Sequence, residues 1–200
     1  MPDSKAIFVA TKNAGKLHEL RALFSGSGWR LETFGGYADV AEGTSSYAEN
    51  AALKATALYR QLLRAGRAEN VLGDDSGLEV AALGGRPGVL SARYGGADAT
   101  WPERRALLRR ELAASGSGDR SARFVCALHF IRNAGSTIAV ECYVAGSISA
   151  EDAGASGFSY DAAFWYPPGR KTFGELTGDE KNRVSHRGRA VAALLRGLEC

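Results

Sequence analysis

Cysteine is scarce in this chain of 200 residues, which holds only Cys126, Cys142 and Cys200. No two of them form a C-x-x-C pair, the spacing that is typical of zinc sites and redox motifs. The scarcity therefore argues against a zinc site and against a disulfide framework. It favours the reducing environment of the cytoplasm.

Long hydrophobic runs are missing as well. No segment approaches the roughly 20 apolar residues that a membrane-spanning helix needs. The first five residues, MPDSK, lack the apolar region of a secretory signal peptide. We therefore expect a soluble cytoplasmic protein that has no membrane partner.

A strong excess of charge of one sign is also absent, because the net charge at pH 7 is only +3. Arginine is concentrated in residues 100–123, but Leu107, Leu108 and Leu112 recur there at helical spacing. This pattern indicates an amphipathic helix with a solvated basic face. Nucleic-acid binding is thus only weakly indicated, and we expect no nucleic-acid partner.

Apolar residues make up 45% of the chain, which suffices for one core or for two closely apposed lobes. No linker-like segment divides the chain, so we expect a single domain over residues 1–200. Capping-box patterns at Ser46, Thr100 and Thr177 predict three helix starts. The main β-like runs are residues 7–10, 30–34, 78–83, 123–132 and 136–148, and the last two predict a hairpin. This order predicts an α/β fold with a mixed sheet.

The stretch ATKNAGKLHEL lies between an apolar run and a helical pattern, so it predicts a strand-to-helix turn. The free backbone N–H groups and the helix dipole make such a turn an anion site. Thr11 and Asn13 can donate hydrogen bonds to phosphate, and Lys12 or Lys16 can add positive charge. The alternative is that Asn13 only caps the helix and that the lysines are solvated, because the glycines of a P-loop are missing.

The motif GDDSGLEV offers two adjacent carboxylates, Asp74 and Asp75, on a predicted turn closed by Ser76 and Gly77. In an extended segment neighbouring side chains point to opposite faces, so one aspartate can face a ligand while structural hydrogen bonds hold the other. Carboxylate oxygens suit Mg²⁺, which needs only one or two of them when a substrate phosphate also binds it. The alternative is an Asx-turn with two solvated acids.

A second acid and base, Glu42 and Lys54, lie nearby in the sequence and can converge on the same place. Asn50 and Lys54 are four residues apart on a predicted helix, so they share a face. Taken alone, an acid in a loop and a lysine on a helix are ordinary surface residues.

The segment GASGFSYDAAFWYPPG, residues 154–169, crowds aromatic side chains among small residues. We expect Phe158 to offer a stacking surface for a base and Phe164 to lie in the core. Farther on, Ser185 predicts a second helix start, which would place His186 and Arg187 at a helix N-terminus. A helix N-terminus is a suitable place to meet an anion or the edge of a base.

Together these segments resemble the inosine triphosphate pyrophosphatases, also called noncanonical purine nucleoside triphosphate pyrophosphatases. The matching motifs are TKNAGKLHEL, ENAALKA, GDDSGLEV, GGRPGVLSARYGG, GFSYDAAF and EKNRVSHRG. The resemblance implies an elongated two-lobed fold with a central substrate cleft, and a homodimer. It implies Mg²⁺-dependent hydrolysis of ITP, dITP and XTP to the monophosphate and pyrophosphate.

The resemblance also assigns site residues. Asp75 and Lys54 match catalytic positions, with Asp75 as the base that activates water, and Glu42 and Asp75 match the metal ligands. The substrate-binding positions are Thr11, Lys12, Asn13, Lys16, Ser76, Phe158, Ser159, Tyr160, Asp161, Lys181, His186 and Arg187. The aromatic segment departs from the family pattern at Ser156, Ser159 and Ala162, where glycine, glycine and proline are usual.

Two other functions compete with this interpretation. One is a pyrophosphatase of the related Maf type, which acts on pyrimidine or modified nucleotides, although the SHR segment and the aromatic segment favour purine. The other is a phosphate- or RNA-binding module that uses the arginine-rich helix. The paired acids argue against that module, because carboxylates repel nucleic acid unless a metal intervenes.

Overall fold

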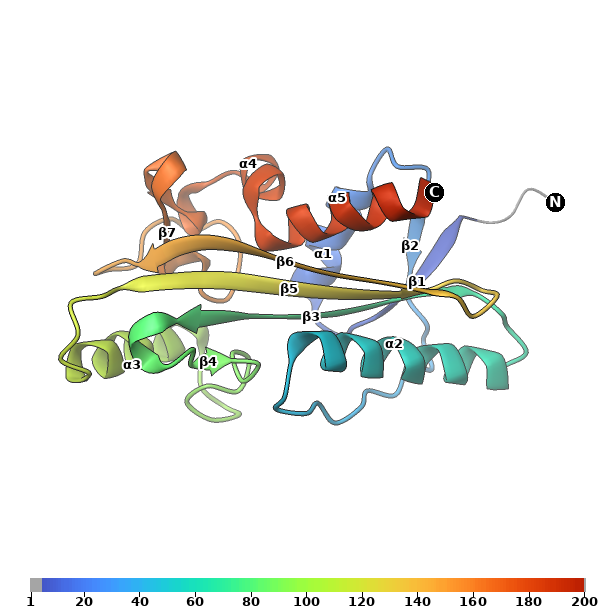
Figure 1. The fold of residues 1–200 in the computed structure, drawn as a ribbon, viewed down its shortest axis with the longest axis horizontal. Coiled ribbons are helices and arrows are strands. Elements are labelled where there is room, and N and C mark those ends of the chain that lie inside the picture. Colours follow the sequence, from blue (N-terminus) through green and yellow to red (C-terminus); the bar gives the residue numbers. More distant parts are fainter. Residues whose placement is uncertain (1–4, 200) are drawn as a thin grey trace. The chain divides into compact units, whose positions relative to one another are not determined.

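The computed structural model describes residues 5–199, so Cys200 lies outside the described residues. Figure 1 shows a sheet with helices packed on it. The strands are β1 (Ala6–Ala10), β2 (Arg30–Glu32), β3 (Asn70–Val80), β4 (Pro87–Gly88), β5 (Ser121–Ile131), β6 (Thr137–Ile148), β7 (Phe164–Tyr166) and β8 (Lys171–Thr172). The α-helices are α1 (Ala14–Phe24), α2 (Tyr47–Arg64), α3 (Trp101–Ala114), α4 (Gly178–Val184) and α5 (His186–Glu199). The hydrogen-bonded strand order is β2-β1-β3-β5-β6-β7-β8, with β4 paired to β3.

The chain forms two compact units. The first comprises residues 1–75, 126–142 and 187–200, and the second comprises residues 76–125 and 143–186. Strands β3, β5 and β6 each contribute residues to both units. That the whole chain acts as one domain remains a prediction.

In the first unit, β1 pairs in parallel with both β2 and β3. Helices α1 and α5 cover one face of this part of the sheet, where Leu20, Ile7 and Val191 share a core. Helix α2 covers the other face, where Leu58 packs with Phe8 in a second core. The side chains of β1 alternate between the two cores, as the period of a strand requires.

In the second unit, β6, β7 and β8 pair antiparallel. A single apolar core joins α3, through Leu108 and Leu112, to Phe124 of β5 and Phe164 of β7. Phe164 is fully buried, which confirms the prediction that it lies in the core.

The arginine-rich segment is a helix that buries Leu108 and Leu112, as the leucine spacing predicts. The prediction of a solvated basic face is wrong for most of its arginines, because Arg104 is buried and the side chains of Arg105 and Arg109 are only 12% and 20% exposed.

The mixed α/β class, the capping boxes at Thr100 and Thr177 and the β5–β6 pairing are confirmed. The predicted turn at Asp74–Gly77 is wrong, because β3 runs without interruption through this motif. Gly73 pairs with Ala10 of β1, and Leu78 pairs with Gly88 of β4. Partners on both sides of the motif therefore hold its backbone extended. Within residues 5–199, none of the helices combines the length and the apolar character needed to span a membrane.

Helix α2 approaches β3 most closely at Gly73. A Cβ atom built there would lie 2.0 Å from the carbonyl oxygen of Ala51 and 2.9 Å from the amide nitrogen of Ala55. We expect Gly73→Ala to lower the free energy of unfolding by about 3 kcal/mol, because overpacking must push the helix from the strand. Urea unfolding measures this effect. Gly35→Ala is the matched control, since its Cβ would meet no atom within 4 Å, and equal stability of the two variants would contradict the prediction.

Candidate active site

The parallel register of β1 and β3 brings two of the sequence motifs together in the first unit. Ala10, the last residue of β1, is the partner of Gly73, the residue before Asp74. The strand-to-helix turn that begins at Thr11 therefore lies at the same position along the sheet as the two aspartates. The turn lies at the carboxyl end of β1, where ligands commonly bind in α/β folds, whereas the two aspartates lie within β3.

Asn13 caps helix α1. Its side-chain oxygen accepts a hydrogen bond from the Lys16 amide at 3.1 Å, and its own amide donates to the Thr11 hydroxyl at 3.1 Å. The capping interpretation is thus correct for Asn13. Lys12 is exposed, whereas the Lys16 side chain is only 13% exposed, so the interpretation of both lysines as solvated fails for Lys16.

Asp74 is the centre of a buried ionic network. Its carboxylate contacts the Lys16 ammonium at 2.6 Å and the Arg187 Nε at 2.9 Å, and it accepts a weak hydrogen bond from Cys126. Arg187 also pairs with Glu19 of α1. Burial by itself would raise the pKa of Asp74, but the Arg187 and Lys16 charges hold this pKa below its usual range.

Asp75 has a different set of partners. Its carboxylate contacts Lys54 at 3.0 Å and accepts a hydrogen bond from the Asn50 side chain at 3.0 Å. The Lys54 ammonium also pairs with Glu42. Burial alone would lower the pKa of Lys54, but Asp75 and Glu42 raise it. The two aspartates therefore have different hydrogen-bond partners, as their alternation along a strand predicts, although the Lys16 ammonium also lies 4.0 Å from Asp75.

These contacts decide which aspartate can act as a base. Both oxygens of Asp74 are engaged by cations, and the residue is 1% exposed. A carboxylate whose pKa is held low is a poor proton acceptor. Asp75 has one direct ionic partner, Lys54, at hydrogen-bond distance, so it is the better candidate.

The carboxylates of Glu42 and Asp75 could hold a cation between them, because both contact the Lys54 ammonium. Within residues 5–199 there is no group of three or more side chains arranged to hold a metal ion. The donor set nevertheless fits Mg²⁺, which often takes only one or two protein carboxylates and completes its shell with water and phosphate.

Two participants did not figure among the site residues expected from the sequence. Asn50 donates to Asp75 and accepts a hydrogen bond from the Gly43 amide at 2.8 Å, so it links the Glu42 loop to β3. In the sequence, the spacing of four residues between Asn50 and Lys54 indicated that they share a helix face, but it did not indicate that Asn50 binds Asp75. Glu19 pairs with Arg187, and no pattern in the sequence connects residues so far apart.

The second unit assembles the predicted base-binding residues around Asp161. This carboxylate accepts hydrogen bonds from the Lys181 ammonium at 2.5 Å and from the Phe158 amide at 2.7 Å. The Lys181 ammonium lies 5.2 Å from the centre of the Phe158 ring. A Cβ atom at Gly157 would lie 2.2 Å from Asp161, so only glycine fits there.

The other predicted residues of the second unit support this loop or border it. Tyr160 is fully buried and donates a hydrogen bond to the Ser91 carbonyl at 3.0 Å, so it supports the loop from inside the core. His186 is 4% exposed and stacks on Phe124 with ring centres 4.8 Å apart. Ser76 lies within β3, half-buried.

The restart of the helix at Ser185 is confirmed, since α4 ends there and α5 begins at His186. Arg187 is 1% exposed and belongs to the first unit, where Asp74 and Glu19 engage two of its nitrogens. That Arg187 contacts a base remains a prediction.

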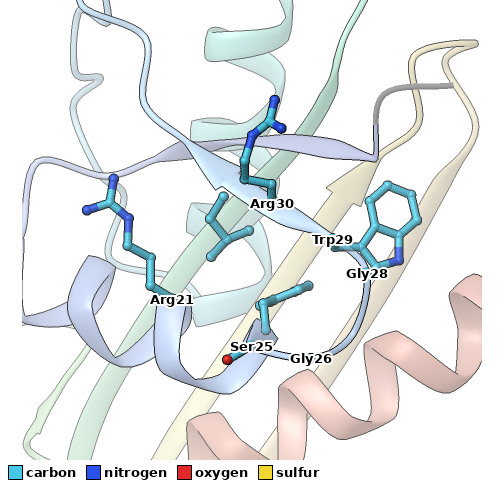
Figure 2. Close-up of a pocket in the computed structure, with 8 residues that line it drawn as sticks. Arg21, Ser25, Gly26, Gly28, Trp29 and Arg30 are labelled. Carbon is cyan, nitrogen blue, oxygen red and sulfur yellow. The ribbon is translucent and has the colours of Figure 1, made fainter. Parts of the chain in front are cut away.

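A surface pocket of about 660 Å³ lies at the other end of α1 (Figure 2). It is lined by Arg21, Phe24, Ser25, Gly26, Gly28, Trp29, Arg30 and Leu31. No residue of this lining is a predicted site residue. This pocket is therefore not the candidate active site.

The model of the Ham1 family matches residues 7–197. The chain belongs to the Ham1 family. It is 46% identical over 193 residues to the dITP/XTP pyrophosphatase of Geobacillus kaustophilus, covering 95% of this chain and 92% of that protein. The Gloeobacter violaceus dITP/XTP pyrophosphatase is 46% identical over 191 residues, covering 96% and 93%. The resemblance seen in the sequence motifs is thus confirmed.

Solved structures agree with this assignment. A HAM1 protein from Coxiella burnetii superposes with a TM-score of 0.85 at 34% identity, covering 97% of this chain and 98% of the other. The dITP/XTP pyrophosphatase of Mycobacterium abscessus superposes with a TM-score of 0.72 at 40% identity, covering 95% and 98%. The Ham1 fold therefore extends over nearly the whole chain.

Asp74→Asn tests the buried network. We expect it to lower the free energy of unfolding at pH 7 by about 3–5 kcal/mol, because breaking a buried pair leaves Arg187 and Lys16 with less compensating charge. A carboxylate whose pKa is lowered by folding stabilises the folded protein. This stabilisation is complete above the pKa in the unfolded state, ~4, and is lost as the pH falls through the pKa in the folded state. The difference between wild type and variant should therefore be constant from about pH 5 to 8 and shrink in stronger acid.

Denaturant unfolding across this pH range supplies the measurement. Asp179→Asn, at an exposed position of α4, is the control for the loss of one surface carboxylate. A difference below about 1 kcal/mol at pH 7 would place the Asp74 pair among ordinary surface ion pairs and contradict the prediction.

Proposed function

We propose that this chain is a nucleoside triphosphate pyrophosphatase that hydrolyses ITP, dITP and XTP to the monophosphate and pyrophosphate, and so removes these nucleotides from the cellular pool. The observation that carries the proposal is the position of Asp75 beside the turn that follows β1, where the Lys16 ammonium lies 4.0 Å from the Asp75 carboxylate. The names of the related dITP/XTP pyrophosphatases support the same substrates.

The phosphate groups bind where α1 begins. Backbone N–H groups of the first turn and the Lys16 ammonium offer hydrogen bonds and positive charge to the outer phosphates. Lys12 and Thr11 extend this surface toward solvent. Phosphates held there as a group leave together, so we expect pyrophosphate rather than orthophosphate as the product.

Asp75 accepts the proton of the attacking water. Lys54 holds one oxygen of this carboxylate, and Asn50 holds the other, so the carboxylate keeps a fixed orientation. Glu42 and Asp75 would hold Mg²⁺, which supplies charge neutralisation and a more acidic water when it is bound.

The residues of the second unit that surround Phe158 are proposed to bind the base. The exposed part of the Phe158 ring offers a stacking face, and His186 offers a hydrogen-bond donor. A donor aimed at O6 suits a 6-oxo purine and opposes adenine, whose amino group also donates. With ATP in the site, the donor and the adenine amino group would both be buried without an acceptor. This free-energy penalty is the proposed reason that ATP is not hydrolysed.

A homodimer, a cytoplasmic location and the absence of a nucleic-acid partner remain predictions. The RNA-binding alternative has little structural support, because the arginines of α3 bond largely within their own unit. Arg104 donates to the carbonyls of Tyr94 and Gly96, and Arg105 and Arg109 pair with Asp152.

Asp75→Asn tests the proposed reaction. The change is nearly isosteric but removes the proton acceptor and a metal ligand, so we expect kcat for ITP to fall by ~10²-fold or more. Release of pyrophosphate and orthophosphate from ITP, dITP, XTP, GTP and ATP is measured separately. Asp98→Asn, in a surface loop of the second unit, serves as the control. Orthophosphate as the first product, or near-normal activity of the Asp75 variant, would contradict the proposal.

Lys54→Met tests whether the lysine occupies the proposed cation site in the free protein. The variant leaves Glu42 and Asp75 without their shared ammonium, so we expect Mn²⁺ and Mg²⁺ to bind the nucleotide-free protein about tenfold more tightly or better. Isothermal titration calorimetry and Mn²⁺ electron paramagnetic resonance measure this binding without any turnover. The variant should nevertheless lose activity, because it also lacks the ammonium of Lys54, which the family resemblance places at a catalytic position. Metal binding that stays equal or weakens in Lys54→Met would remove Glu42 and Asp75 as the ligands.

A further inference from the structure

The 157–161 loop carries most of the proposed base-binding residues and contains an unusual backbone conformation. Ser159 has a φ of +65°, in the left-handed region that favours glycine. Within residues 5–199, Arg170 is the only other non-glycine residue with a positive φ. Such a conformation persists only where neighbouring groups hold it.

An arginine of helix α3 binds the backbone of Ser159. The Nη1 of Arg105 donates a hydrogen bond to the Ser159 carbonyl at 2.6 Å. Its Nε donates to Asp152 at 2.8 Å, which fixes the plane of the guanidinium. The Arg105 side chain is only 12% exposed, whereas the Asp152 side chain is 36% exposed, so the bond to the Ser159 carbonyl is the better shielded of the two.

Arg109 binds the same aspartate but makes no hydrogen bond to the 157–161 loop. It pairs with Asp152 and donates to the Ser149 carbonyl at 3.1 Å. Asp152 thus lies between two arginines one helical turn apart, and only Arg105 bonds the 157–161 loop. This asymmetry separates the effect of the loop contact from the effect of the ion pairs.

The loop is held on its other side by the groups already described. Asp161 binds the Phe158 amide and the Lys181 ammonium, and Lys181 lies beside the Phe158 ring. Ser159 is the next residue after Phe158, so a change in its backbone angles would redirect the ring. The position of the proposed stacking surface therefore depends on both ends of this short loop.

We propose that Arg105 is a positioning residue for base selection, which holds Ser159 in its left-handed conformation and thereby sets the place of the Phe158 ring. The proposal rests on the proposed function for its substrate and on the loop geometry for its mechanism. Arg105 does not contact the nucleotide in this scheme. It acts through the Ser159 carbonyl.

Hydrogen–deuterium exchange of the protein without nucleotide tests the mechanism first. We expect Arg105→Ala to raise exchange in the peptide that covers residues 157–161 by about tenfold, with little change in α1 and α2. Arg109→Ala removes the other partner of Asp152, and Arg110→Ala removes an exposed arginine of the same helix. Both controls should leave exchange in the loop near the wild-type rate. Unchanged exchange in Arg105→Ala, or an equal rise in both controls, overturns the proposal.

Kinetics then test the consequence for the base. In Arg105→Ala we expect KM for ITP to rise about tenfold, kcat to stay within about twofold, and the ITP-to-ATP ratio of kcat/KM to narrow. Arg105→Lys should fall between wild type and Arg105→Ala, because one ammonium cannot form the planar fork. A raised exchange rate with wild-type KM and selectivity overturns the role in base selection.

Ser159→Gly provides a rescue that a general loss of stability would not give. Glycine adopts the left-handed conformation without strain. Adding Ser159→Gly to Arg105→Ala should therefore lower KM for ITP part of the way to the wild-type value and partly restore the ITP-to-ATP ratio of kcat/KM. Failure of glycine to recover either one overturns the proposal. If the wild-type protein hydrolyses none of the purine triphosphates, the proposed function fails, whereas the exchange rates still decide whether Arg105 holds the loop.

Discussion

The buried carboxylate of Asp74 is the interaction on which the first unit depends. It joins Arg187 of α5 and Lys16 of α1 to the middle of β3, and Arg187 joins α1 again through Glu19. An isolated charge buried this deeply would be strongly destabilised, so each member of the network needs the others. Through Lys16 the network also ties the first turn of α1, which we propose binds phosphate, to β3.

The alternation of side chains along β3 places Asp74 and Asp75 in different surroundings. Asp74 faces helices α1 and α5 and is fully neutralised there, whereas Asp75 faces α2 and meets Lys54 and Asn50. A close approach of α2 to β3 at Gly73 is what lets these two short-range bonds form. Two adjacent and chemically identical residues thus acquire different roles from the geometry of one strand.

Much of this arrangement could be predicted from local sequence patterns. Apolar periodicity predicted the helices and the long hairpin, and the capping-box patterns at Ser46, Thr100 and Thr177 predicted three helix starts, because these features depend on residues close in the chain. The extended backbone at Asp74–Gly77 could not be predicted, because its hydrogen-bond partners come from β1 and β4. Glu19 and Arg105 were missed for the same reason, since their partners lie 168 and 54 residues away.

Charge balance gives a physical reason for a metal requirement. Within residues 5–199, the ion pairs around β3 bring together the carboxylates of Glu19, Glu42, Asp74 and Asp75. A triphosphate bound beside them would add several more negative charges. The exposed Lys12 and the dipole of α1 offset only part of that repulsion. A divalent cation held by Glu42 and Asp75 would offset this repulsion, which is the physical reason for including Mg²⁺ in the proposed function.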